Sequence, residues 1–175
     1  MSRAVITLVP AVRPLPPAPS EGFESLFRAH YGRLVRTLTL AAGDRELAAD
    51  AVQEAFVRAH VHWRRIEGYE DPIGWVRRVA VNLLHDDRRR TDRKRRAIER
   101  LAAEPSSVPA PREPDDLDRL LAWLAPQQRT AVALHYVEEL SIAEVAAAMG
   151  LATGSVKSHL HDARRRLRTR LERGA

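Results

Sequence analysis

The chain has 175 residues, enough for one ordinary hydrophobic core or two small ones. Its 29 Lys and Arg outnumber its 23 Asp and Glu, and the formal net charge of +6 favours a polyanionic partner such as nucleic acid. The absence of cysteine excludes disulfides, thiolate zinc sites and a cysteine nucleophile, and it fits a reducing cytoplasm.

Two proline-rich stretches divide the chain. The N-terminal stretch is apolar, but Pro10 interrupts it and it is too short to span a bilayer, so residues 1–19 are predicted to be a disordered tail of a cytoplasmic protein without membrane insertion. The second stretch predicts a flexible linker at 102–115 between modules at 20–101 and 116–173. Fully extended, such a linker holds the two modules about 40 Å apart.

The spacing of apolar residues predicts an all-α fold, because every periodic segment has the helical period. In the first module, one helix ends at Gly43, Asp44 caps a second that runs to about residue 60, and Asp71 with Pro72 begins a long third helix. The predicted buried stripe of the first helix consists of Phe23, Leu26, Phe27, Tyr31, Leu34, Val35 and Leu38.

The second module is predicted to be a set of short helices followed by a long one. Pro126 opens a helix, and Ser141 with Glu144 forms a capping box at the start of the next. Gly150 ends that helix, and Thr153 is expected to cap the last one.

Ala146, Gly150 and Val156 meet the requirements of a helix-turn-helix: a small residue at the crossing, a glycine at the turn and an aliphatic anchor. A helical hairpin that binds nothing remains the alternative. The polar side chains of the last helix favour DNA binding, because the first turns of a recognition helix reach base edges. The outward residues here are Thr153, Ser155, Lys157, Ser158, His161, Asp162 and Arg165.

Two surfaces of the first module also indicate binding. Asp50, Gln53, Glu54 and Arg58 share an exposed helix face, which suggests a basic protein partner, although a solvated face is the alternative. The basic run at 86–100 favours phosphate binding over a frayed helix end.

Aromatic residues flank the loop before this basic helix. Trp63 is expected in the core, whereas Tyr69 and Trp75 are left open between core positions and base stacking.

Together these motifs resemble those of the extracytoplasmic-function (ECF) sigma factors, which are two-domain members of the sigma-70 family. The matching segments of the first module are FESLFRAHYGRLVR, DAVQEAF and DPIGWVRRVAVNLLHDDRR. In the second module the match runs from LAPQQRTAVALHYVEELSIAEVAAAMG to LATGSVKSHLHDARRRLR.

The resemblance implies that the first module is sigma region 2 and the second is sigma region 4. Core RNA polymerase, through its β′ clamp helices and β flap, promoter DNA and an anti-sigma factor are then the expected partners. The acidic face would dock on the clamp helices, and the last helix would read the −35 element. The implied −10 contacts are Tyr69, Trp75, Arg77, Arg78, Asn82, Arg88 and Arg89.

The resemblance implies no catalytic residue, metal or cofactor, since the polymerase performs the chemistry. Relatives often have Arg where this chain has His159 and Asp162, so its −35 preference is expected to be unusual. The main alternative function is a helix-turn-helix regulator that does not engage polymerase. An enzyme has little support, because the histidine pairs are two residues apart on helices and point away from a shared metal.

Overall fold

The computed structural model describes residues 20–101 and 116–174, with side chains at 20–90 and 117–172. The predicted N-terminal tail and linker lie outside the described residues. All secondary structure in the described ranges is helical, and the all-α prediction is confirmed.

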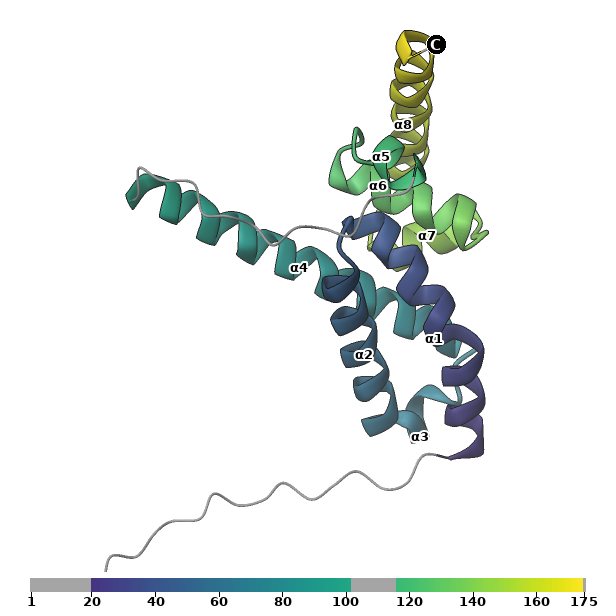
Figure 1. The fold of residues 1–175 in the computed structure, drawn as a ribbon. Coiled ribbons are helices and arrows are strands. Elements are labelled where there is room, and N and C mark those ends of the chain that lie inside the picture. Colours follow the sequence, from purple (N-terminus) through teal and green to yellow (C-terminus); the bar gives the residue numbers. More distant parts are fainter. Residues whose placement is uncertain (1–19, 102–115, 175) are drawn as a thin grey trace, which may run out of the picture.

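The first module contains four helices, and Figure 1 shows α1, α2 and the first half of α4 packed together while the second half of α4 projects away. Their bounds are α1 (Glu21–Ala42), α2 (Arg45–Val61), α3 (Trp63–Ile66) and α4 (Pro72–Leu101).

The predicted helix ends of this module are confirmed. Gly43 has a left-handed φ of 72° and its amide donates to the Thr39 carbonyl, which closes α1. The Asp44 carboxylate accepts a hydrogen bond from the Leu47 amide at 3.1 Å, and the Asp71 carboxylate accepts one from the Gly74 amide at 2.9 Å. These caps fix where α2 and α4 begin.

The core of the first module is built from the predicted apolar stripes. Leu38, Val52, Phe56 and Leu84 are almost entirely buried. Phe27 departs from its predicted core position, because 37% of its surface is exposed. It lies at the rim of the core, where its ring meets the edge of Phe56 and leaves one side in contact with solvent.

The second module consists of short helical elements followed by one long helix. Its elements are α5 (Asp116–Leu121), α6 (Pro126–Val132), the π-helical turn η1 (Ala133–Val137), α7 (Ile142–Met149) and α8 (Thr153–Gly174). Thr153 is the first residue of α8 rather than its cap, because the Val156 amide already bonds to the carbonyl of Ala152. The π turn was not predicted.

The two modules pack directly against each other, in contrast to the separation of about 40 Å that an extended linker permits. Helix α7 lies against α4, and α6 and η1 lie against α1 (Figure 1). The buried apolar residues of both modules belong to one contiguous cluster. In the described part of the chain, the two modules therefore share one hydrophobic core. We call this arrangement closed.

Candidate nucleic-acid interface

Helices α7 and α8 form a helix-turn-helix whose geometry follows from a few residues. Ser141 and Glu144 make the predicted capping box, with each side chain bonded to the other residue's amide. Gly150 has a left-handed φ of 63°, and the Leu151 amide bonds to the Ala146 carbonyl at 3.0 Å. Val156 is fully buried and anchors α8 on the module. The turn therefore places the first turns of α8 at the surface.

The capping carboxylate is held in its ionised form. Hydrogen bonds from Ser141, first through its side chain and then through its backbone, lower the pKa of Glu144, and the charge of Arg77 lowers it further. The pKa of Glu144 thus depends on the start of its own helix and on a cation of the first module.

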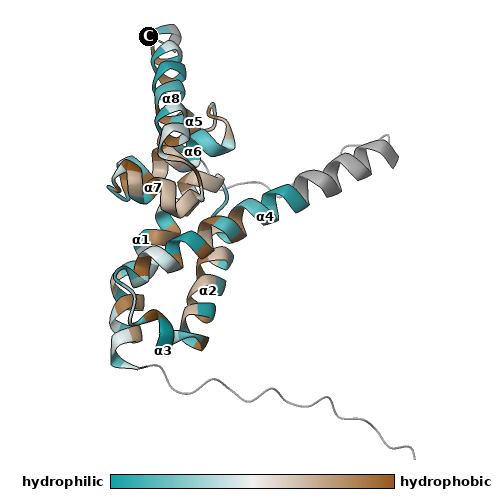
Figure 2. Ribbon diagram, turned by 180° about the vertical axis from the view of Figure 1, so that it is seen from behind, coloured by the Kyte–Doolittle hydropathy of each residue, from teal (hydrophilic) through white to brown (hydrophobic). Residues whose placement is uncertain are grey.

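The outer face of α8 is open to solvent, as predicted. Asp162 is partly exposed, while the other six residues are exposed: Thr153, Ser155, Lys157, Ser158, His161 and Arg165. The Ser158 hydroxyl donates to the carbonyl of Gly154, one turn earlier. Figure 2 shows the projecting part of α8 as mostly hydrophilic. This face offers cations, hydroxyls and an imidazole along one helix.

Asp162 lies beside a cation of its own helix. Its Oδ1 is 3.3 Å from Nη2 of Arg165, and the two side chains are 41% and 71% exposed. An exposed pair at this spacing adds little stability. Its effect is to restrict where the Arg165 guanidinium points on the outer face of α8.

The residues predicted to contact single-stranded DNA lie on α4 and on the loop before it, but they are not equally accessible. Tyr69, Arg78, Asn82 and Arg89 are exposed, and Trp75 is partly buried. The structure thus gathers most of the predicted residues along one side of α4.

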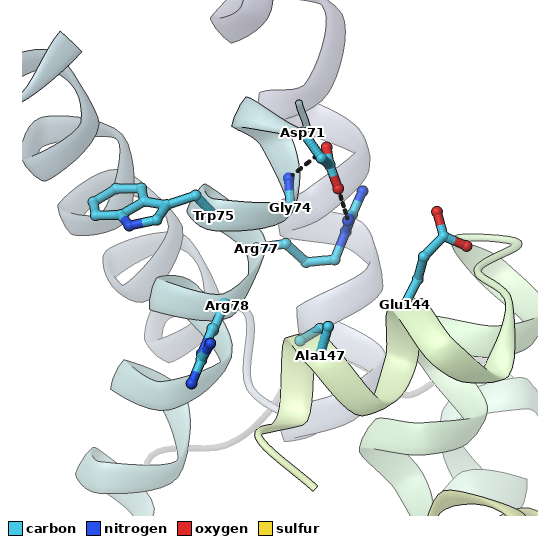
Figure 3. Close-up of a pocket in the computed structure, with 8 residues that line it drawn as sticks. Asp71, Gly74, Trp75, Arg77, Arg78, Glu144 and Ala147 are labelled. Carbon is cyan, nitrogen blue, oxygen red and sulfur yellow. Dashed lines mark hydrogen bonds and ion pairs between the residues drawn. The ribbon is translucent and has the colours of Figure 1, made fainter. Parts of the chain in front are cut away.

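Two of the predicted cations on α4 already have partners in the protein. Arg88 is partly buried and donates to the carbonyl of Ala41, at the end of α1. Arg77 is buried at the seam with α7. Its guanidinium points from α4 toward α7 and lies beside Asp71, whereas Trp75 points the other way (Figure 3).

The acidic surface on α2 is exposed as the sequence predicts. Asp50, Gln53, Glu54 and Arg58 are all exposed, and Arg58 pairs with Glu54 at 2.7 Å. The same helix also exposes two valines that sequence reasoning missed, Val57 and Val61. The sequence could have indicated them, because two apolar residues four positions apart fall outside the buried stripe of this helix.

Trp63 lies in the first-module core, as predicted, with its ring 5.5 Å from that of Phe23. Trp123 was not singled out from the sequence, although it is exposed and Arg170 of α8 stacks over its ring at 4.6 Å. This cation–π contact ties the projecting half of α8 to the rest of the module.

Family models for sigma-70 region 2 and for sigma-70 region 4 match residues 26–94 and 115–167. The ECF RNA polymerase sigma factor SigL of Mycobacterium tuberculosis is 34% identical over 158 residues, which cover 85% of this chain and 88% of that protein. The chain belongs to the ECF sigma factor family. The predicted family is confirmed.

One further curated relative and one solved structure are also similar to this chain. The ECF sigma factor SigE of Mycolicibacterium smegmatis is 32% identical over 160 residues, and the match covers 83% of this chain and 60% of that longer protein. The sigma factor RpoE of Bartonella quintana, solved in complex with the anti-sigma factor NepR, has the same fold with a TM-score of 0.69 at 21% identity. That match covers 87% of this chain and 98% of the solved one.

The ECF regions can now be placed on the structure. The region 2 match contains the acidic face of α2 and the side of α4 that carries most of the predicted −10 residues, and the region 4 match contains the helix-turn-helix. Within the described ranges no three His, Asp or Glu side chains gather to hold a metal ion. None of the described helices is long and apolar enough to cross a membrane.

Proposed function

We propose that this ECF sigma factor binds core RNA polymerase and directs promoter-specific transcription initiation. Region 4 reads the −35 element as duplex through α8, and region 2 opens the −10 element and holds the non-template strand along α4. The observation that carries the proposal is the open polar face of α8, whose seven predicted contact residues lie at the surface of a helix-turn-helix.

The acidic face of α2 supports the polymerase part of the proposal. Carboxylates are repelled by DNA phosphates, whereas Asp50 and Glu54 suit a basic protein surface. We assign this face, with Gln53 and Arg58, to the β′ clamp helices, and region 4 to the β flap. Val57 and Val61 give it an apolar centre that fits a protein partner better than a solvated helix.

Regulation by an anti-sigma factor is part of the proposal, since the solved relative from Bartonella quintana was crystallised with one. The protein needs no catalytic residue or cofactor of its own, because the polymerase forms the phosphodiester bonds. We place it in the cytoplasm, at the nucleoid when it is part of the holoenzyme.

The test is transcription in vitro from a pool of randomised promoters, with core polymerase of Mycolicibacterium smegmatis and the purified chain. We expect transcripts that start downstream of a shared pair of sequence elements. The same pool without the chain is the control. If verified core and folded chain give no start sites above that control, the proposal is wrong.

A further inference from the structure

The seam between the two regions contains a carboxylate that is almost completely buried. The side chain of Glu138, which follows the π turn η1, is only 4% exposed. A buried carboxylate costs free energy unless hydrogen bonds and opposite charges compensate it. Each charged partner found for Glu138 in the described residues belongs to the other region.

Three residues of region 2 converge on this carboxylate. The Thr37 hydroxyl donates to Oε2 at 3.0 Å, and Nε of Arg33 lies 3.3 Å from the same oxygen. Nη2 of Arg77 lies 3.8 Å from Oε1, and Arg77 is itself 7% exposed. Arg33 also donates to the backbone carbonyl of Glu138 at 2.7 Å. Two guanidinium groups and a hydroxyl thus hold one anion.

Two unusual backbone features of region 4 place the Glu138 carboxylate in this site. The Glu138 amide bonds to the carbonyl of Ala133, five residues earlier, which widens the helix by one residue. Glu139 then takes a left-handed φ of 60°, which turns the chain away after the carboxylate. A π turn and a left-handed non-glycine residue are uncommon, and they often accompany a functional constraint.

The set of donors is the kind that binds a phosphate. Two arginines and a hydroxyl recognise phosphate oxygens in the same way as carboxylate oxygens. Arg77 lies on α4 between Trp75 and Arg78, which line the cleft of about 210 Å³ between α4 and α7 (Figure 3). The anion site therefore adjoins the side of α4 that we assign to the −10 strand.

We propose that Arg33, Thr37 and Arg77 form a DNA-phosphate site of region 2, and that Glu138 of region 4 occupies this site when the chain is closed. The proposal rests on the assignment of α4 to single-stranded DNA. In the closed chain region 4 covers part of the −10 surface but leaves the outer face of α8 open. Closure therefore withholds this phosphate site from a DNA strand and spares duplex binding.

The seam also contains two like charges. Arg129 of α6 lies near Arg88 of α4, and burial followed by the charge of Arg88 lowers the pKa of Arg129. Nη1 of Arg129 lies so close to Gly43 that a Cβ atom at that position would be 2.8 Å from it. The like charges of Arg129 and Arg88 thus partly offset the attraction at Glu138.

The main test compares Glu138→Gln with Glu139→Gln in the full chain. Both variants remove one negative charge near Arg33, since Oε2 of Glu139 lies 3.7 Å from Nη2 of Arg33. Glu139 is the matched control because its side chain is 83% exposed, whereas that of Glu138 is buried. The probe is a fluorescent random-sequence DNA 12-mer, single-stranded, followed by anisotropy. Only molecules in which region 4 has left the site can bind the strand there, so the fraction of open molecules limits the apparent affinity. We therefore expect Glu138→Gln to bind the 12-mer about tenfold more tightly than Glu139→Gln does.

The salt dependence tests whether a phosphate enters the vacated site. Each phosphate contact of a single strand adds about 0.7 to the slope of log affinity against log salt, so the slope should steepen by about 0.7 in Glu138→Gln. Adding Arg33→Gln to this variant should abolish both gains. Excess inorganic phosphate should compete only weakly, because a strand makes further contacts along α4; complete competition at equal concentration would point to a free-phosphate site and overturn the DNA assignment.

Closure is measured separately by energy transfer. The chain has no cysteine, so Arg45→Cys in α2 and Thr169→Cys in α8 give two specific labelling positions, both exposed. Transfer efficiency should fall in Glu138→Gln and stay unchanged in Glu139→Gln. Glu138→Asp keeps the charge but shortens the side chain, and an intermediate value is expected.

Circular dichroism checks that each variant keeps its helical content. Folded Glu138→Gln that matches Glu139→Gln in transfer efficiency, affinity and salt slope would overturn the proposal. None of these readouts uses polymerase. A failure to direct transcription would therefore leave this result standing, and the reverse also holds.

Discussion

Helices α4 and α8 both carry several arginines, yet these arginines differ in how exposed they are. The outer face of α8 is open along its first three turns, whereas α4 buries Arg77 and directs Arg88 to the end of α1. The difference arises from neighbours far away in sequence, because α7 and η1 pack on the first module. Similar cation-rich sequence can therefore give one helix face that is open and another whose cations are partly buried or bonded within the protein.

The largest expected effect lies on a third surface and separates polymerase binding from DNA binding. Asp50→Arg combined with Gln53→Ala should reduce transcription in vitro by at least about 100-fold, because a new cation would face a basic partner. Duplex DNA binding by α8 should stay within about twofold, since both residues lie on α2, which packs on α1, α3 and α4 rather than on the helix-turn-helix. Surviving transcription would show that this face of α2 is not the polymerase contact.

The second prediction contrasts a buried cation with an exposed one. Arg77→Ala should lower the free energy of unfolding by at least about 1 kcal/mol, because Glu138 then stays buried with one cation fewer. Lys157→Ala should change it by less than about 0.5 kcal/mol, since Lys157 is exposed. Urea unfolding followed by circular dichroism measures both. Equal costs would mean that the seam adds nothing to stability.

Lys157→Ala should nevertheless weaken duplex binding. Loss of one phosphate contact should reduce the salt slope by about 0.9, with a similar effect on all sequences. Fluorescence anisotropy on a randomised duplex pool at several salt concentrations measures this slope. An unchanged slope would remove Lys157 from the interface.

Asp162 tests how α8 chooses its sequence. Asp162→Arg should shift the preferred sequence in a selection from random duplexes, with a change of about 1–3 kcal/mol at one base pair. Asp162→Asn is the matched control, since it releases Arg165 without adding a cation. If both variants select the wild-type sequence, Asp162 plays no part in recognition.

The smallest expected effect is a pH dependence in α4. Burial, followed by the charges of Arg88 and Arg89, lowers the pKa of His85 below its ordinary 6.5. The unfolded chain therefore takes up a proton at higher pH than the folded one, and stability should fall as pH drops from about 7 toward 5. His85→Gln should flatten this part of the stability curve. A slope that persists in this variant would assign the effect to another group.

The helices and their ends could be predicted because their causes are local. Gly43, Asp44, Asp71 and the Ser141 capping box each act within four residues, so the sequence alone locates them. The outward face of α8 followed in the same way from the helical period and the glycine turn. For α8 the sequence indicated which side chains face outward, and the structure agrees.

The closed arrangement could not be predicted, because it depends on contacts between residues about 100 positions apart. Thr37 and Glu138 look like ordinary polar residues in the sequence, and only the fold brings them within 3.0 Å. The π turn that delivers Glu138 also lacks a recognisable sequence signal. Arg77 was therefore assigned to DNA without any indication that region 4 covers it.

The central claim is that α8 and α4 of one chain contact two separate promoter elements in the same complex. A photo-crosslinking amino acid placed at Ser158 and, in a second preparation, at Asn82 tests this in the complete holoenzyme on a promoter selected from the random pool. Ser158 should crosslink to duplex DNA near −35, and Asn82 to the non-template strand near −10. Crosslinks from both positions to the same element, or from neither in an active complex, would contradict the claim.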